Sequence, residues 1–229
     1  MLEIKERLSC ATYSGYLTGK GNFRHKVATV KPYKGNRKSE KPYHYQAIRD
    51  YLVENHGAVI VDGMEADDAV AIEATQNPQA IIVSRDKDLR QVPVSVYSYP
   101  LGNNPEKFEH KGLVGHEGYA FNNFLRQVVI GDTTDNYPGL PRKGESFYEK
   151  LVINAYHQAG YKVNEEFTRD LYNRVQFAYI EHYGEKGIER FLEQATLAWM
   201  VRELDNEGNP VLPTPEFDFY AKYYFSNNQ

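Results

Sequence analysis

Acidic side chains that could bind hard metal ions occur in three groups along the chain, in the segments MEADDAV, VSRDKDL and IGDTTDN. Their members are Glu65, Asp67, Asp68, Asp86, Asp88, Asp132 and Asp135. Two carboxylates about 5 Å apart repel each other by roughly 1 kcal/mol in water and by more inside a protein. Gathering them therefore needs compensation, which Mg²⁺ or Mn²⁺ provides through oxygen ligands. A pair of such ions is suited to phosphodiester hydrolysis, because one lowers the pKa of an attacking water and both stabilise charge on the phosphoryl oxygens.

Each acidic group also has a purely structural explanation. Acidic residues in the first turn of a helix interact favourably with its dipole, so EADD is also typical of a helix start. DKD is also typical of a solvated turn, and GDTTDN of a helix cap with a turn. Three such groups in one α/β chain, each after an apolar run, favour a joint metal site, and the lack of Cys and His pairs argues against structural zinc.

Basic and acidic residues are segregated, although the net charge is only −4. Residues 20–49 hold nine Lys or Arg against a single Glu, whereas residues 51–135 hold six basic and thirteen acidic residues. Carboxylates alone would repel phosphates. A basic segment beside an acidic one therefore indicates a polyanion held near metal ions.

Apolar runs bounded by turn residues alternate with helical periodicity in the first half of the chain. We expect strands at 14–18, 58–61, 80–84 and 94–99. We expect helices at 44–54, 65–76, 118–130, 146–158, 168–183 and 187–202. This order predicts an α/β fold with a parallel sheet, followed by a helical region. Ligands bind at the carboxyl ends of such strands, so the first two acidic groups should converge there.

Length and composition predict a soluble cytosolic protein. The 229 residues can bury a core, and Cys10 is the single cysteine, so no intrachain disulfide forms. Neither a signal peptide nor an apolar run of membrane-spanning length is evident. The residues from 206 to 229 are weakly periodic and are expected to be a strap or a loose tail.

In order, the segments LTGKGNFR, YKGNR, EADD, SRDKDL and GDTTDNYPGLP resemble the flap endonuclease or 5′-3′ exonuclease family, and phage-type members above all. The family also includes the 5′-nuclease domain of bacterial DNA polymerase I. The resemblance runs from about Leu17 to Leu151 and implies a PIN-like (Rossmann-like) parallel sheet flanked by helices, followed by a helical helix-three-turn-helix region. It implies an α/β nuclease core with a basic arch at 1–130, a helical DNA-binding region at 131–205 and a C-terminal tail or strap at 206–229.

The resemblance also implies roles for individual residues. The seven carboxylates would hold two Mg²⁺ or Mn²⁺ ions, directly or through water. The expected catalytic residues are Lys34, Arg37, Asp68 and Asp86, with the first two as arch residues at the scissile phosphate. The expected DNA-binding residues are Lys20, Arg24, Lys34, Arg37, Lys38, Arg142 and Lys143, although a solvated surface is an alternative for Lys20, Arg24, Lys38, Arg142 and Lys143. Tyr33 is expected either to stack on a base or to be a core or rim aromatic.

The chain departs from the family pattern at three places. The family opens with a strand whose Asp binds metal, and no such strand precedes Ser14, so the sheet is expected to lack its central strand. A second family Asp falls on Gly19. After the Pro/Gly turn, the Gly-x-Gly-x-Lys pattern that implies a K⁺ site reads RKGES at 142–146. A truncated gene product, a misplaced start and half of a split protein each explain the first departure.

The leading hypothesis is a divalent-metal-dependent phosphodiester hydrolase that acts as a 5′-3′ exonuclease or structure-selective 5′ flap endonuclease. Its substrates would be DNA with 5′ ends, flaps or branches, and RNA in hybrids. The alternatives are a degenerate or split nuclease-like protein that binds branched DNA without cleaving it, and a PIN-type ribonuclease. We expect a phage or prophage protein in the cytoplasm of a bacterial host, either a monomer or a chain that needs a missing N-terminal fragment.

Overall fold

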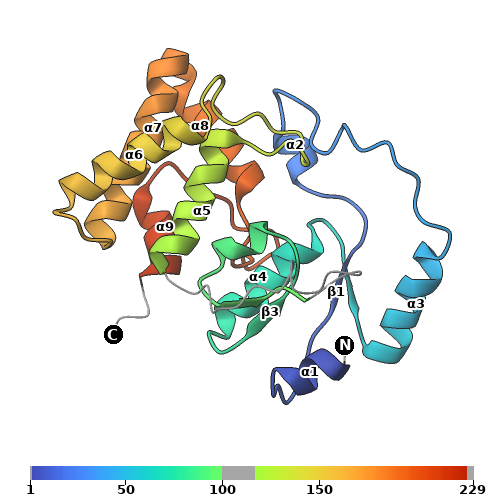
Figure 1. The fold of residues 1–229 in the computed structure, drawn as a ribbon. Helices are drawn as coiled ribbons and strands as arrows, with labels where there is room; N and C mark the ends of the chain where they lie inside the picture. Colours follow the sequence, from blue (N-terminus) through green and yellow to red (C-terminus); the bar gives the residue numbers. More distant parts are fainter. Residues whose placement is uncertain (1, 100–116, 226–229) are drawn as a thin grey trace.

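The computed structural model describes residues 2–99 and 117–225 and contains short parallel strands flanked by helices (Figure 1). The strands are β1 (Tyr16–Thr18), β2 (Val59–Val61), β3 (Ile81–Val83) and β4 (Ser95–Tyr97). In register, β1 pairs with β2 and β3 with β4. The predicted α/β fold with parallel strands is confirmed. Within the described ranges, however, the expected single sheet is present as two separate two-stranded sheets.

Helix α4 (Ala66–Gln76) joins these two sheets, because it packs against β1, β2 and β3. Its buried Ala71 and Ala74 lie in one apolar cluster with Ile82 of β3 and Val96 of β4. Small alanine side chains let the helix lie close to the strands. The start of α4 is thereby placed at the carboxyl ends of β1 and β2, as the parallel arrangement predicts.

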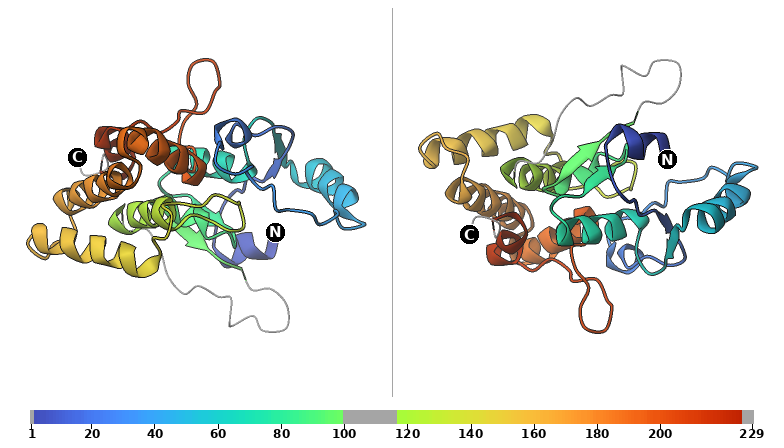
Figure 2. Two further views of the ribbon diagram at one scale, coloured as in Figure 1. Left: turned by 90° about the horizontal axis from the view of Figure 1, so that it is seen from above. Right: turned by 90° about the horizontal axis from the view of Figure 1, so that it is seen from below.

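The basic segment is largely exposed, apart from the buried Arg24 and Tyr33. Helix α1 (Leu2–Arg7) precedes β1, and α2 (Arg24–Val27) is linked by an extended stretch to α3 (Tyr45–His56). Figures 1 and 2 show α3 on the opposite side of the molecule from α5 to α9. Helix α3 buries no residue, and Ile48 and Tyr51, whose spacing predicted the helix, are 57% and 56% exposed. The pattern thus predicted the helix correctly but not a buried face for it.

The second half of the chain is a helical bundle around an aromatic core. It contains α5 (Glu117–Ile130), α6 (Glu145–Gln158), α7 (Glu165–Tyr183), α8 (Gly187–Ala198) and α9 (Phe217–Tyr224), with a short 3₁₀ turn at Gly184–Lys186; another 3₁₀ turn, Asp88–Gln91, lies between β3 and β4. At the centre, the ring of Trp199 lies edge-on to Phe124 of α5 at a centroid distance of 5.3 Å. Tyr220 of α9 completes this contact at 5.4 Å from Phe124.

One expectation for the C-terminal third is corrected. Helix α8 ends at Ala198 rather than near 202, because the backbone turns to extended geometry at Trp199. Of the two alternatives for the C-terminal segment, a strap or a loose tail, the described residues 206–225 fit a strap, since α9 buries Phe217, Tyr220 and Tyr224 in the aromatic core. The domain boundaries stay predictions, and residues 1, 100–116 and 226–229 of those ranges lie outside the described residues. In the described chain, no helix combines the length and apolarity that crossing a bilayer requires.

We predict that Phe124→Ala lowers the free energy of unfolding by about 3 to 5 kcal/mol, because it opens a cavity in the aromatic core. Phe124 is completely buried, whereas Phe177 of α7 is 58% exposed. Phe177→Ala is therefore the matched control, with an expected change of about 0.5 kcal/mol or less. Urea unfolding followed by circular dichroism measures both. Equal losses in the two variants would contradict the assigned core.

Candidate functional site

The turn after α5 presents Asp132 and Asp135. Gly131 and Gly139 lie back to back at positive φ, and a Cβ on Gly139 would fall 2.4 Å from the Gly131 nitrogen. Only glycine fits this approach. Asp132 Oδ1 accepts hydrogen bonds from the backbone N–H of Thr134 at 2.6 Å and of Asp135 at 3.3 Å. The turn therefore fixes the direction of the Asp132 carboxylate.

The basic loop that carries Lys34 and Arg37 docks on this turn. The Lys34 N–H donates to the backbone oxygen of Asp135 at 2.9 Å, and Asn36 Nδ2 donates to the backbone oxygen of Thr133 at 2.7 Å. Segments about 100 residues apart in the sequence are thereby held together. The basic loop and the acidic turn are therefore in direct contact; the polyanion that the charge segregation indicates stays a prediction.

Lys34 joins two of the predicted carboxylates. Its ammonium forms an ion pair with Glu65 and lies 3.6 Å from Asp135 Oδ2. Arg37 donates to Asp135 Oδ1 at 2.7 Å. The Tyr33 hydroxyl donates to Asp135 at 2.7 Å and to Glu65 at 3.2 Å, and Tyr33 is only 3% exposed. Its ring is therefore a core aromatic in this structure, not one open to a base.

Lys87 joins a second pair of carboxylates. Its ammonium donates to Asp132 Oδ2 and lies 3.3 Å from Asp88 Oδ1, which also accepts from Gln127 of α5. Burial raises the pKa of Asp132, but the hydrogen bond and charge of Lys87 and the backbone donors outweigh it, so the net pKa lies below the ordinary value. For Asp88, burial and the charge of Asp86 prevail over Lys87 and raise the pKa to about 6.

The charges of Asp67 and Asp86 interact with these two pairs. Burial and the charges of Asp86 and Glu65 raise the pKa of Asp67 to about 7. The charge of Asp86 thus acts on both Asp67 and Asp88. The structure brings together six of the predicted carboxylates in one electrostatically coupled row. They are Glu65, Asp67, Asp86, Asp88, Asp132 and Asp135.

This row does not fit divalent ions in its present arrangement. Among the described residues, no three His, Cys, Asp or Glu side chains lie close enough to share a metal ion. Carboxylate oxygens are the ligands that Mg²⁺ and Mn²⁺ prefer, so the donor chemistry is suitable while the spacing is not. Each of two ammonium groups already contacts two of these carboxylates, Lys34 with Glu65 and Asp135, and Lys87 with Asp88 and Asp132.

Asp68 and Arg24 have a structural role. Both are completely buried and form a two-pronged ion pair, with each N–O distance 2.7 Å. Arg24 also donates to the backbone oxygen of Trp199 at 2.5 Å, and Asp68 accepts from the N–H of Val201 and of Glu65, each at 3.0 Å. In this structure neither side chain is open to a metal ion or to a phosphate, so the expected roles of Asp68 as a catalytic metal ligand and of Arg24 as a phosphate contact stay untested predictions without support from the geometry.

The other predicted DNA-binding residues lie on the surface. Lys20, Lys38 and Arg142 are exposed, and Lys143 stacks its ammonium over Phe147 at 4.3 Å. Their role in DNA binding stays a prediction, as does the K⁺ site. At Gly19, a Cβ would lie 2.1 Å from Asp62 Oδ1 and 2.9 Å from the Val61 oxygen, so this backbone leaves no room for the Asp seen in the resembling family.

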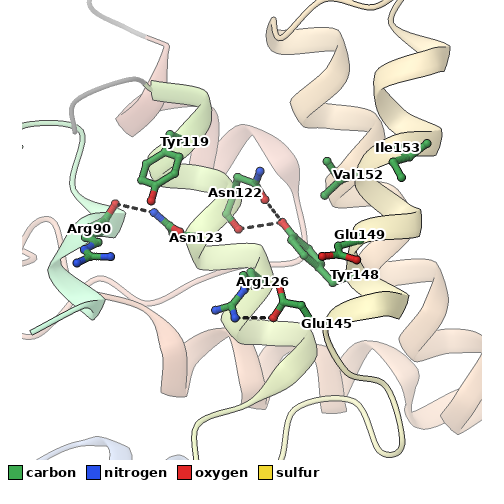
Figure 3. A pocket seen from close by; sticks show the side chains of 10 residues that line it. All are labelled: Arg90, Tyr119, Asn122, Asn123, Arg126, Glu145, Tyr148, Glu149, Val152 and Ile153. Atoms are coloured by element: carbon green, nitrogen blue, oxygen red, sulfur yellow. Dashed lines mark hydrogen bonds and ion pairs between the residues drawn. The ribbon is translucent and has the colours of Figure 1, made fainter. Parts of the chain in front are cut away.

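Sequence reasoning missed two residues of the site. Lys87 stands between Asp86 and Asp88 in the DKD motif, and this position between two predicted metal ligands could have indicated that it belongs to the site. Gln127 lies 39 residues from its partner Asp88 and had no local signal. A cavity of about 640 Å³ between α5 and α6 contains none of the predicted residues (Figure 3). Arg126 on its wall is already paired with Glu145, and we assign this cavity no chemistry.

Comparison with known proteins supports the resemblance. No family model matches the chain. A curated 5′-3′ exonuclease of Buchnera aphidicola subsp. Schizaphis graminum (strain Sg) is 31% identical over 141 residues, covering 56% of this chain and 47% of that protein. The chain thus spans about half the length of the curated relative it matches. The match confirms the resemblance to the 5′-3′ exonuclease family.

Solved structures of bacteriophage T5 nucleases are similar in outline. A flap endonuclease variant in a pseudo-enzyme-product complex with DNA and metal ions has 15% identity and a TM-score of 0.48, covering 86% of this chain and 88% of that one. A mutant of the T5 5′-exonuclease has 13% identity and a TM-score of 0.48, covering 86% and 89%.

We predict that Arg24→Met lowers the free energy of unfolding by about 3 to 5 kcal/mol, because it leaves the Asp68 carboxylate buried without its partner. The double variant Arg24→Met with Asp68→Leu should recover part of this loss. Arg169→Met, which removes an exposed pair with Glu165, is the control and should change stability by about 0.5 kcal/mol or less. A loss below about 1 kcal/mol for Arg24→Met in urea unfolding would contradict the buried pair.

We predict that Asp67→Asn reduces the loss of stability on raising the pH. The pKa of Asp67 is about 7 in the folded chain against an ordinary value of 3.8. Between these values the folded state keeps a proton that the unfolded state releases, so stability falls as the pH rises. Thermal unfolding in EDTA across this range measures the slope. Asp50→Asn, at an exposed position, is the control, and an unchanged slope in Asp67→Asn would refute the assignment.

Proposed function

We propose that this chain, which resembles the flap endonuclease or 5′-3′ exonuclease family, is a divalent-metal-dependent phosphodiester hydrolase that cleaves DNA at 5′ ends or flaps. The observation that carries the proposal is the meeting of Lys34 and Arg37 with a group of six carboxylates from the strand ends and from the turn after α5. The curated relative, named a 5′-3′ exonuclease, supports the same reaction class.

The basic loop supplies the groups that a phosphodiester needs. Arg37 is half exposed, with 51% of its side chain accessible, and offers a planar set of N–H donors that matches phosphate oxygens. Lys34 offers a compact positive charge beside it. Donors placed where negative charge develops stabilise the transition state more than the ground state. We assign both residues this role.

The carboxylate row repels a phosphodiester unless cations compensate it, so we propose a requirement for Mg²⁺ or Mn²⁺, with two ions expected. We propose duplex DNA with a 5′ end, flap or branch as the substrate, with RNA in hybrids as a further substrate. Lys20, Lys38, Arg142 and Lys143 are proposed to contact the DNA backbone. Affinity for DNA should then fall as the salt concentration rises.

A labelled 5′-flap duplex, incubated with the folded chain and Mg²⁺ or Mn²⁺ or with EDTA, tests the proposal. We predict metal-dependent release of short 5′ products. Arg37→Gln should slow cleavage by about 10²-fold or more, because one transition-state donor is lost. Asp86→Asn should abolish metal-dependent cleavage. Arg169→Gln removes an exposed Arg on α7 and should cleave like the unchanged chain.

Other outcomes would favour the alternatives. Tight binding of the flap without cleavage in either metal would support a nuclease-like DNA-binding protein. The lack of room for an Asp side chain at Gly19, where Asp62 and the Val61 oxygen lie, favours the same alternative. Faster cleavage of structured RNA than of flap DNA would support a PIN-type ribonuclease. If Arg37→Gln and Asp86→Asn both fold and cleave normally, the assignment of this site is refuted.

A further inference from the structure

Glu193 of α8 holds the start of the basic loop, just after α2. Its Oε1 accepts from the backbone N–H of Thr29 at 2.8 Å and of Val30 at 3.1 Å, and its Oε2 accepts from the Thr29 hydroxyl at 2.7 Å. Arg190 of the same helix donates to Glu193 Oε2 at 2.6 Å and to the Thr29 hydroxyl at 2.7 Å. One side chain of the helical bundle thus binds two successive residues of the loop, across 164 positions of the sequence.

The Glu193 carboxylate is charged although its side chain is only 6% exposed. Burial raises its pKa, but the hydrogen bonds from Thr29, Val30 and Arg190 outweigh burial, so the net pKa lies below the ordinary value. A buried carboxylate that loses its donors is costly. The start of the loop is therefore fastened to α8, although Thr29 and Val30 are themselves exposed.

A second anchor lies two residues further along the loop. Asn136 Nδ2 donates to the backbone oxygen of Pro32 at 2.8 Å, and the Lys34 N–H donates to that of Asp135 at 2.9 Å. The Gly35 N–H closes a turn onto the Pro32 oxygen at 3.0 Å. Within this turn Lys34 has a φ of +53°, which residues with a side chain rarely adopt. Such a conformation persists only where the surrounding structure holds it.

We propose that Glu193 is a positioning residue, which fastens the start of the basic loop to α8 so that Lys34 and Arg37 stay aligned with the phosphate to be cleaved. The proposal rests on the roles of Lys34 and Arg37 in the proposed function. The hydrogen bonds of Glu193 to the loop go to Thr29 and Val30, so its effect on the reaction is transmitted through the backbone. A catalytic group misplaced by about 1 Å costs roughly 10²-fold in rate. Loss of the anchor should therefore lower kcat more than it raises KM.

Steady-state cleavage of the labelled 5′-flap duplex tests this role. We expect Glu193→Ala to lower kcat about tenfold or more and to change KM by less than about threefold. Glu193→Gln keeps an oxygen for the two backbone donors and should recover part of the loss. Glu189→Ala, one turn earlier on α8 with a side chain that is 65% exposed, is the matched control and should cleave like the unchanged chain. Glu193→Ala combined with Arg37→Gln should lose less than the product of the two separate losses, because one acts through the other.

Limited trypsin digestion in EDTA measures the anchor without DNA or metal. The loop offers cleavage sites after Lys34, Arg37 and Lys38. In Glu193→Ala these sites should be cut about fivefold faster or more, because the loop opens locally more often. Cleavage after the exposed Lys150 of α6 should keep its rate. Equal acceleration at Lys150, identified by mass spectrometry, would show general unfolding and would overturn the local anchor.

The inference and the proposed function fail in different ways. If trypsin cuts the loop of Glu193→Ala no faster than that of Glu189→Ala, Glu193 does not anchor the loop, whatever the chain cleaves. If the loop opens but kcat is unchanged, or KM alone rises, Glu193 does not position groups for the reaction. If the loop opens as predicted but the unchanged chain cuts no flap DNA, the anchoring of the loop stands and the nuclease proposal falls.

Discussion

The buried ion pair between Arg24 and Asp68 is the interaction on which the acidic edge of the molecule depends. Taking two charges out of water is costly, and it is tolerated only where further hydrogen bonds complete the pair. Here those bonds come from the backbone of Leu197 in the last turn of α8, of Trp199 and Val201 just after it, and of Glu65 at the start of α4. The pair thereby fastens the basic segment and the α/β layer to the helical bundle. Positions of Glu65, Asp67 and the basic loop all follow from this attachment.

Two lysines are interspersed among the six carboxylates, and this helps to explain how the chain keeps so many like charges close together. Lys34 bridges Glu65 and Asp135, and Lys87 bridges Asp88 and Asp132. The remaining repulsion is relieved by retaining protons, as the raised pKa values of Asp67 and Asp88 indicate. The electrostatic cost of the row is thus spread over two kinds of compensation. Both are adjustable, since an ammonium can swing away and a proton can dissociate.

The sequence predicted the elements well because they depend on local patterns. Apolar runs bounded by turn residues located the strands, and the acidic groups at their ends do lie together. What it could not predict depended on contacts distant in the chain. Asp67 and Asp68 in EADD cannot be told apart from the local sequence. Asp68 is buried and paired because Arg24, held by the backbone of Trp199, approaches it, whereas Asp67 belongs to the row of carboxylates. The aromatic residues of α9 gave only a weak periodic signal in the sequence. Their burial could not be predicted from it, because it depends on residues of α5 and α8 that pack around them.

The division of the strands into two pairs gives the two halves of the acidic row different resistance to local opening. Each pair has three residues per strand, and Val59 and Ile60 of β2 are 54% and 51% exposed, so few buried contacts oppose its separation. The turn that carries Asp132 is instead fastened to the bundle through the Gly139 N–H, which donates to Gln194 at 2.9 Å. Amide hydrogens of β1 and β2 are therefore expected to exchange with solvent through smaller local openings than those of α5 and α8. A local opening of the β1–β2 pair would reach the start of α4, where the N–H of Glu65 is held by the buried Asp68, before it could reach Asp132.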